Sequence, residues 1–208
     1  MKINKKIQKL IINNFELKKK ENILIITDSK LQKIGKLFFE CKSLFENEFF
    51  FLTFKPRKEH GEEPPEFIKR SMKNADIILI PTSKSLSHTK ARIEASKKGA
   101  RIASMPGITL PILRRMLNVD YLSMKKLTEK IAEKLKHSSK VRIKTDIGTD
   151  LVMNIENRIV HKDYGIIKDK GDFGNLPAGE ADLSPKESSC NGKLYIDGSV
   201  LMKKIKEP

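Results

Sequence analysis

Four short apolar segments recur along the first half of the chain, and this recurrence constrains the fold more than any other feature. The segments are NILIITD (22–28), EFFFLTF (48–54), DIILIPTS (76–83) and ARIASMPG (100–107). The stretches between them, such as 29–45 and 85–99, place their apolar residues at helical spacing. Such an alternation of strand and helix predicts a Rossmann-like α/β fold, with a parallel sheet and helices on both faces.

The pattern changes near residue 139. The segments KVRIKT (140–145) and DLVMNI (150–155) alternate apolar and polar residues on either side of a turn at Gly148, which predicts a hairpin. We therefore expect an α/β substrate-side domain over residues 1–138 and a β-rich domain over residues 139–208. The second stretch is short for an independent domain, so we expect an incomplete β domain that ends at Pro208.

Charge and cysteine content narrow the range of partners. The chain has 42 Lys and Arg against 26 Asp and Glu, a net charge of +16, which is typical of a solvated lysine-rich surface; attraction of an acidic substrate or partner is the alternative. The lysines are spread along the chain, and the sequence shows no helix-turn-helix or zinc-finger spacing, so we expect no specific nucleic-acid partner. The alternative, nucleic-acid binding through the positive charge, predicts salt-dependent DNA binding.

The cysteines and the N-terminal segment indicate the compartment. Cys41 and Cys190 lack metal-binding spacing, and both are expected to be reduced thiols. The N-terminal segment has no apolar run suited to a signal peptide or membrane span, so we expect a cytoplasmic protein without a membrane partner.

Parallel sheets bind ligands beyond the carboxyl ends of their strands, and this rule selects candidate residues. Here it selects Asp28 and residues 81–83 and 105–107. His88 follows shortly, near the expected start of a helix, where a neutral imidazole acting as acid or base is favoured. A histidine with no function beside a helix cap is the alternative.

Two further residues of the same region are candidates for binding substrate. Ser83 ends the third apolar segment, at the edge where the sheet rule places ligands. Arg92 lies one helical turn beyond His88 and could hold an anionic group. A surface arginine is the alternative for Arg92.

A tight turn, NLPAGE (175–180), presents a single carboxylate, Glu180. Carboxylate oxygens suit zinc, manganese or iron, and a rigid turn would lose little entropy on binding a cation. A surface glutamate in a β-turn is the alternative, because one carboxylate does not make a metal site. At least two more ligands would be needed.

Several segments resemble the thermophilic metallo-aminopeptidases of the aminopeptidase T group, peptidase family M29, and the related 2,5-dihydroxypyridine dioxygenases. In chain order they are HGEEPP (60–65), SLSHTKAR (85–92), GTDL (148–151), NLPAGE (175–180) and SPKESSCNGKLYIDGS (184–199). The resemblance implies that Glu180 is a metal ligand and that His88 acts in proton transfer or substrate binding. It implies zinc, manganese or cobalt for a leucyl-aminopeptidase-type hydrolase, and Fe(II) for the dioxygenase.

The chain departs from the family pattern in one respect. The family's other ligands lie beyond the point where this chain stops, and His137 and His161 match none of them. We therefore expect an aminopeptidase-like hydrolase with an incomplete metal centre, a peptide or small-molecule substrate, and a homodimer that covers the open β domain. A ring-cleaving dioxygenase is the alternative enzyme, and a non-catalytic module that binds ligands in the α/β cleft is a third possibility.

Overall fold

The computed structural model describes residues 3–200 and 203–204, and the chain groups into two compact units. Unit 1 comprises Met1–Lys126 and Asp163–Gly179, and unit 2 comprises Leu127–Lys162 and Glu180–Pro208. This division differs from the single boundary expected near residue 139. The reason is that the chain returns after unit 2 begins and adds one more strand to the first sheet.

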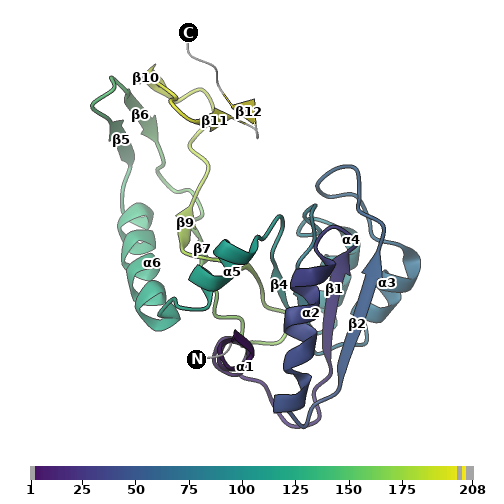
Figure 1. Ribbon diagram of the computed structural model, residues 1–208. Helices are drawn as coiled ribbons and strands as arrows, with labels where there is room; N and C mark the ends of the chain where they lie inside the picture. Colours follow the sequence, from purple (N-terminus) through teal and green to yellow (C-terminus); the bar gives the residue numbers. More distant parts are fainter. Residues whose placement is uncertain (1–2, 201–202, 205–208) are drawn as a thin grey trace. The chain divides into compact units, whose positions relative to one another are not determined.

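A five-stranded sheet with the order β2-β1-β3-β4-β8 forms the centre of unit 1, and every pair in it is parallel (Figure 1). Its strands are β1 (Ile23–Asp28), β2 (Phe49–Phe54), β3 (Ile77–Ile80), β4 (Arg101–Ser104) and β8 (Phe173–Asn175). The four apolar segments of the sequence form the first four strands, which confirms the predicted α/β class. Strand β8 was not predicted, because its three residues FGN carry no strand pattern.

Helices cover both faces of this sheet (Figure 1). On one face lie α1 (Ile3–Phe15), α2 (Gln32–Glu40) with the 3-10 turn η1 (Cys41–Leu44), and α5 (Leu110–Met116). On the other lie α3 (Glu66–Met72) and α4 (Lys90–Lys97). Strand β1 shows why its sequence is apolar throughout: Ile23 and Ile25 pack on the first face, and Leu24 and Ile26 on the second.

Helix α4 begins later than the spacing of the sequence suggested. Thr89 is its N-cap, with a side-chain oxygen that accepts a hydrogen bond from the backbone N–H of Arg92 at 3.2 Å. The residues from Ser85 to His88 therefore form a loop between β3 and α4 instead of the first helical turn. This loop supplies most of the polar groups of the candidate site.

Unit 2 contains the rest of α6 (Tyr121–Lys136), whose first residues belong to unit 1, and several short strands. Strands β5 (Lys140–Lys144), β6 (Asp150–Asn154) and β10 (Asn191–Lys193) form an antiparallel sheet, which confirms the predicted hairpin. Two-stranded sheets pair β7 (His161–Asp163) with β9 (Glu180–Asp182) and β11 (Ser199–Val200) with β12 (Lys203–Lys204). No helix in the described part of the chain is long and apolar enough to span a membrane.

Candidate functional site

Hydrogen bonds within the chain link the carboxyl ends of β1 and β3. In this strand order the crossover direction reverses between these two strands, a common place for ligands. Here the buried Asp28 accepts hydrogen bonds through Oδ2 from the backbone N and the Oγ of Ser83, both at 2.6 Å. Beside this pair, the Oγ1 of Thr27 donates to the carbonyl of Pro81 at 2.8 Å. In this structure Ser83 therefore holds the loop after β3 against Asp28. Its role in substrate binding stays a prediction.

A cavity of about 330 Å³ lies at the carboxyl ends of β3, β4 and β8, within unit 1. Three separate segments line it: the loop after β3, the residue Pro106 after β4, and the stretch from β8 onward. The lining residues are Ser85, Ser87, His88, Pro106, Phe173, Asn175, Leu176 and Pro177. Small-molecule sites typically begin at about this size. Of the predicted site residues, the structure brings His88 to this cavity.

Three serine hydroxyls form a hydrogen-bonded chain from the cavity into the sheet. The Oγ of Ser85 lies 2.8 Å from the Oγ of Ser87, which lies 3.0 Å from the Oγ of Ser104. Ser104 ends β4 and is fully buried, while Ser85 is partly exposed. Because each hydroxyl can both donate and accept, the chain can adjust to either kind of ligand atom.

His88 presents its imidazole to the cavity from an ordered turn. The turn is fixed by Thr89, whose backbone N–H and Oγ1 both donate to the carbonyl of Leu86, at 3.1 and 2.7 Å. The His88 side chain itself is exposed and forms no hydrogen bond with any described residue. Both ring nitrogens are therefore available to a ligand, as an acid, a base or a hydrogen-bond partner requires.

The HGEEPP segment supports the loop without lining the cavity. The Nδ1 of His60 accepts a hydrogen bond from the backbone N–H of Ser85 at 3.2 Å, and the N–H of Gly61 donates to the carbonyl of Ser85 at 2.9 Å. The carboxylate of Glu63 accepts from the backbone N–H groups of Lys90 and Ala91 at the start of α4. A carboxylate at this position satisfies two free N–H groups of the helix and fixes where α4 begins.

Arg92 contacts the cavity walls from outside. Its Nε donates to the carbonyl of Ser87 at 2.6 Å, and its guanidinium lies 4.3 Å from the ring centroid of Phe173. Partial burial lowers the pKa of Arg92, because a charged group loses solvation there. The side chain joins the loop after β3 to strand β8, and its predicted contact with substrate stays a prediction.

The NLPAGE segment contributes Asn175 to the cavity and is held by Asp163. The backbone N–H of Asn175 donates to the Oδ2 of Asp163 at 2.6 Å, and that of Gly179 donates to the Asp163 carbonyl at 2.9 Å. Gly179 has a φ of +131°, and a Cβ there would lie 2.8 Å from the sulfur of Met124. The positive φ favours glycine at this turn, whereas the flexible Met124 side chain can move away from an added Cβ. Sequence reasoning missed Phe173 and Asn175, although Asn175 begins the very segment that drew attention to Glu180.

Glu180 lies outside this cavity lining, as the exposed first residue of β9 in unit 2. Among residues 3–200 and 203–204, no group of three or more His, Cys, Asp or Glu side chains is placed to hold a metal ion. The described residues therefore do not fit a complete metal centre. The role of Glu180 as a metal ligand stays a prediction.

Solved structures with a similar fold include a dioxygenase and an aminopeptidase. The 2,5-dihydroxypyridine dioxygenase from Pseudomonas putida has a TM-score of 0.72 and 14% identity, over 91% of this chain and 57% of that one. Wild-type AmpT from Thermus thermophilus has a TM-score of 0.57 and 13% identity, over 91% of this chain and 63% of that one. The chain thus spans about three-fifths of the length of both structures, and at these identities the likeness is one of fold alone. No curated protein sequence matches the chain.

A family match decides between the two relationships expected from the sequence. The family described as NicX, 2,5-dihydroxypyridine 5,6-dioxygenase, matches residues 15–206, nearly the whole chain. The relationship to the aminopeptidases, which was the main expectation from the sequence, rests on the fold alone. The relationship to the dioxygenases, which was the alternative, is the better supported of the two. The chain belongs to the NicX family of 2,5-dihydroxypyridine 5,6-dioxygenases.

Proposed function

We propose that the cavity at the ends of β3, β4 and β8 binds a single planar ring with polar substituents, of the dihydroxypyridine kind. The chain would then be the substrate-binding part of a ring-cleaving dioxygenase. The observation that carries this proposal is the lining itself, which combines uncharged polar groups with apolar side chains around about 330 Å³.

The polar groups suit a ring with hydroxyl or carbonyl substituents. Ser85, Ser87 and Asn175 provide hydroxyl and amide groups, and His88 provides two ring nitrogens without other partners among the described residues. These groups can donate to or accept from a hydroxyl, a ring nitrogen or a carbonyl oxygen. The apolar part of the lining, which includes Phe173, can cover the faces of a flat ring.

The same lining is less suited to the substrate of an aminopeptidase. Such a substrate carries a free ammonium group, whose burial requires a carboxylate or several acceptors. No Asp or Glu belongs to the residues that line this cavity in the described part of the chain. The dioxygenase family match and the charge of the lining therefore point in the same direction.

The proposal includes a divalent metal only as a possible ligand partner of Glu180. The described residues supply this one candidate ligand, so we derive no catalytic step through a metal. The metal content of the purified chain and of Glu180→Gln, after equilibration with zinc, manganese and Fe(II), tests this point. The matched control is Asp182→Asn on the same strand. Stoichiometric metal that is lost only in Glu180→Gln supports the ligand role, and no metal in the unaltered chain contradicts it.

Calorimetric titration tests the substrate class. We expect 2,5-dihydroxypyridine to bind the unaltered chain about tenfold more tightly than it binds Ser87→Ala or His88→Ala, because each variant loses a hydrogen-bonding group of the lining. Lys33→Gln, an exposed change on α2 away from the cavity lining, should bind normally. Leucinamide is the competing ligand. Tighter binding of leucinamide, or no binding of the pyridine, would contradict the proposal.

A further inference from the structure

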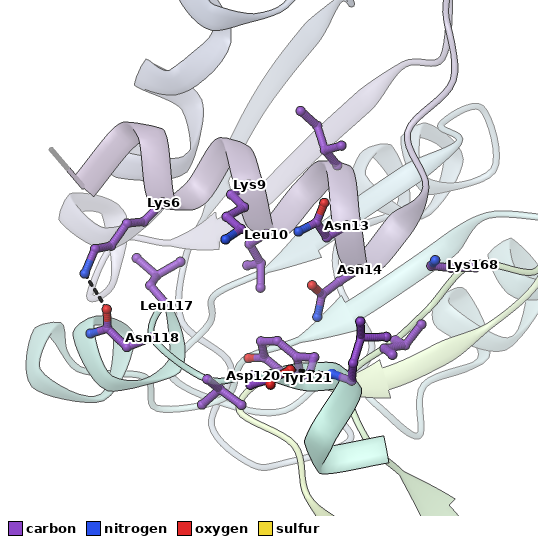
Figure 2. Close-up of a pocket in the computed structure, with 14 residues that line it drawn as sticks. Lys6, Lys9, Leu10, Asn13, Asn14, Leu117, Asn118, Asp120, Tyr121 and Lys168 are labelled. Carbon is purple, nitrogen blue, oxygen red and sulfur yellow. Dashed lines mark hydrogen bonds between the residues drawn. The ribbon is translucent and has the colours of Figure 1, made fainter. Parts of the chain in front are cut away.

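A second and larger cavity lies elsewhere in unit 1. Its volume is about 790 Å³, and it shares no lining residue with the first. Figure 2 shows α1 along one side of it and the connection from α5 to α6, with Asn118, Asp120 and Tyr121, along the other. Nothing in the proposed function uses this space, so its chemistry must be considered separately.

The polar part of its lining has an excess of positive charge. Lys6 and Lys9 reach it from α1, and Lys168 from the segment before β8 (Figure 2). Lys6 donates to the Oδ1 of Asn118. Lys9 and Lys168 have no hydrogen-bond or ion-pair partner among the described residues. Two ammonium groups at this cavity are therefore available to an anion.

Asp120 is the one carboxylate among the described lining residues, and it is already engaged. Its Oδ2 accepts from the hydroxyl of Ser123 at 2.8 Å, and its Oδ1 accepts from the backbone N–H groups of Leu122 and Ser123. These bonds, first of all that from the Ser123 hydroxyl, hold the pKa of Asp120 below its usual range. The carboxylate stays ionised as the cap of α6, and three lysines against one aspartate leave a net charge of about +2 at neutral pH.

The rest of the lining is mostly apolar, with Asn13 and Asn14 as its further polar side chains. Leu10, Leu117, Val119 and Ile166 contribute side chains, together with Tyr121, which is only 7% exposed. The Tyr121 hydroxyl donates to the carbonyl of Met116 at 3.3 Å, and burial raises the pKa of this phenol. The tyrosine is therefore neutral and bonded within the protein, and it offers the cavity an apolar ring.

From this combination we infer that the second cavity binds an organic anion with an apolar body, a carboxylate or a phosphate monoester. The anionic oxygens would contact Lys9 or Lys168, and the apolar part would pack toward Leu10 and Tyr121. An uncharged ligand would gain nothing from the positive charge of the lysines, and a purely inorganic anion would leave the apolar side chains of the lining unused. The inference is independent of the pyridine site and of any metal.

Calorimetric titration with octanoate and with octyl phosphate tests the inference on the full chain. We expect at least one of the two to bind, and the double variant Lys9→Gln/Lys168→Gln to bind it at least tenfold more weakly. The matched control is Lys33→Gln/Lys36→Gln, a pair of exposed lysines on α2 outside the lining. A rise in sodium chloride from about 0.05 to 0.5 M should weaken binding to the unaltered chain, which tests the charge contribution without any variant.

The outcome also distinguishes a carboxylate ligand from a phosphate monoester. Preference for octanoate indicates a carboxylate ligand, and preference for octyl phosphate indicates a phosphate monoester. The inference is overturned if neither ligand binds, if 1-octanol binds as tightly as both, or if inorganic phosphate binds as tightly as octyl phosphate. It is also overturned if the double variant and its control bind equally.

Discussion

Units 1 and 2 differ most in how deeply their strands are buried. Every residue of β1, β3 and β4 in unit 1 is buried, whereas no residue of β5 or β6 in unit 2 is. Both large clusters of buried apolar side chains belong to unit 1, and the buried apolar residues described in unit 2 are Ala132 and Ile155. Unit 1 is therefore stabilised chiefly by apolar burial, whereas unit 2 depends more on strand pairing and turns.

Exposed apolar side chains do not separate the two units. Phe50, Phe67 and Leu122 of unit 1 are at least half exposed, as are Ile159 and Leu194 of unit 2. The homodimer expected from the sequence, which would cover part of unit 2, stays a prediction that sedimentation velocity can test.

The largest expected difference between the units concerns apolar truncation. Leu79→Ala in β3 removes a fully buried side chain and should lower the free energy of unfolding by about 2–5 kcal/mol. Val152→Ala in β6 removes a partly exposed one and should cost less than about 1 kcal/mol. Urea unfolding of the two variants measures both values. Equal losses would show that unit 2 has a core as important as that of unit 1.

A smaller effect is expected at the junction between the loop after β3 and β8. Arg92→Ala removes the bond to Ser87 and the contact with Phe173, and should cost about 1–3 kcal/mol of stability. It should also weaken pyridine binding, because both partners of Arg92 belong to the cavity wall. Arg115→Ala, an exposed change on α5, is the control for thermal unfolding and titration. If binding is unchanged, Arg92 does not position the cavity wall.

A loss of about 0.5–1 kcal/mol in the free energy of unfolding is expected from a change at the start of α4. Glu63→Ala removes the carboxylate that accepts from the N–H groups of Lys90 and Ala91. Hydrogen exchange of those two amides should accelerate in the variant. Glu59→Ala, an exposed neighbour in the same loop, should leave their exchange unchanged.

The smallest effect is expected in unit 2, at the ion pair between Arg142 and Asp150. The guanidinium of Arg142 contacts both carboxylate oxygens at 2.7 Å, and this hydrogen bonding holds the pKa of Asp150 below its usual range. A depressed carboxyl pKa adds stability above the pKa of the unfolded chain, about 4, and that stability disappears as the pH falls through the folded-state pKa.

Asp150→Asn should therefore destabilise the hairpin slightly at pH 7, and the difference should vanish in acid and in high salt. Urea unfolding of the variant and the unaltered chain, at neutral and acidic pH, measures this difference. A difference that persists in acid would show that the asparagine acts through packing instead of charge.

The sequence by itself determined the parts that depend on local periodicity. Four apolar runs separated by helical spacing specified four parallel strands, and two-residue alternation around Gly148 specified the β5–β6 hairpin. The sheet rule also led to the edge where His88 lies. These features could be predicted because the buried face of a strand or helix appears in the sequence as a regular spacing of apolar residues.

Only the tertiary structure decided how distant segments meet. Strand β8 pairs with β4 across about 70 residues of chain, and this pairing brings Phe173 and Asn175 to the loop that carries His88. The hydrogen bonds from Ser83 to Asp28 likewise join residues far apart in sequence, at the strand ends where ligands were expected. No local pattern records such contacts, because their energy comes from pairing and packing between segments that the chain brings together only on folding.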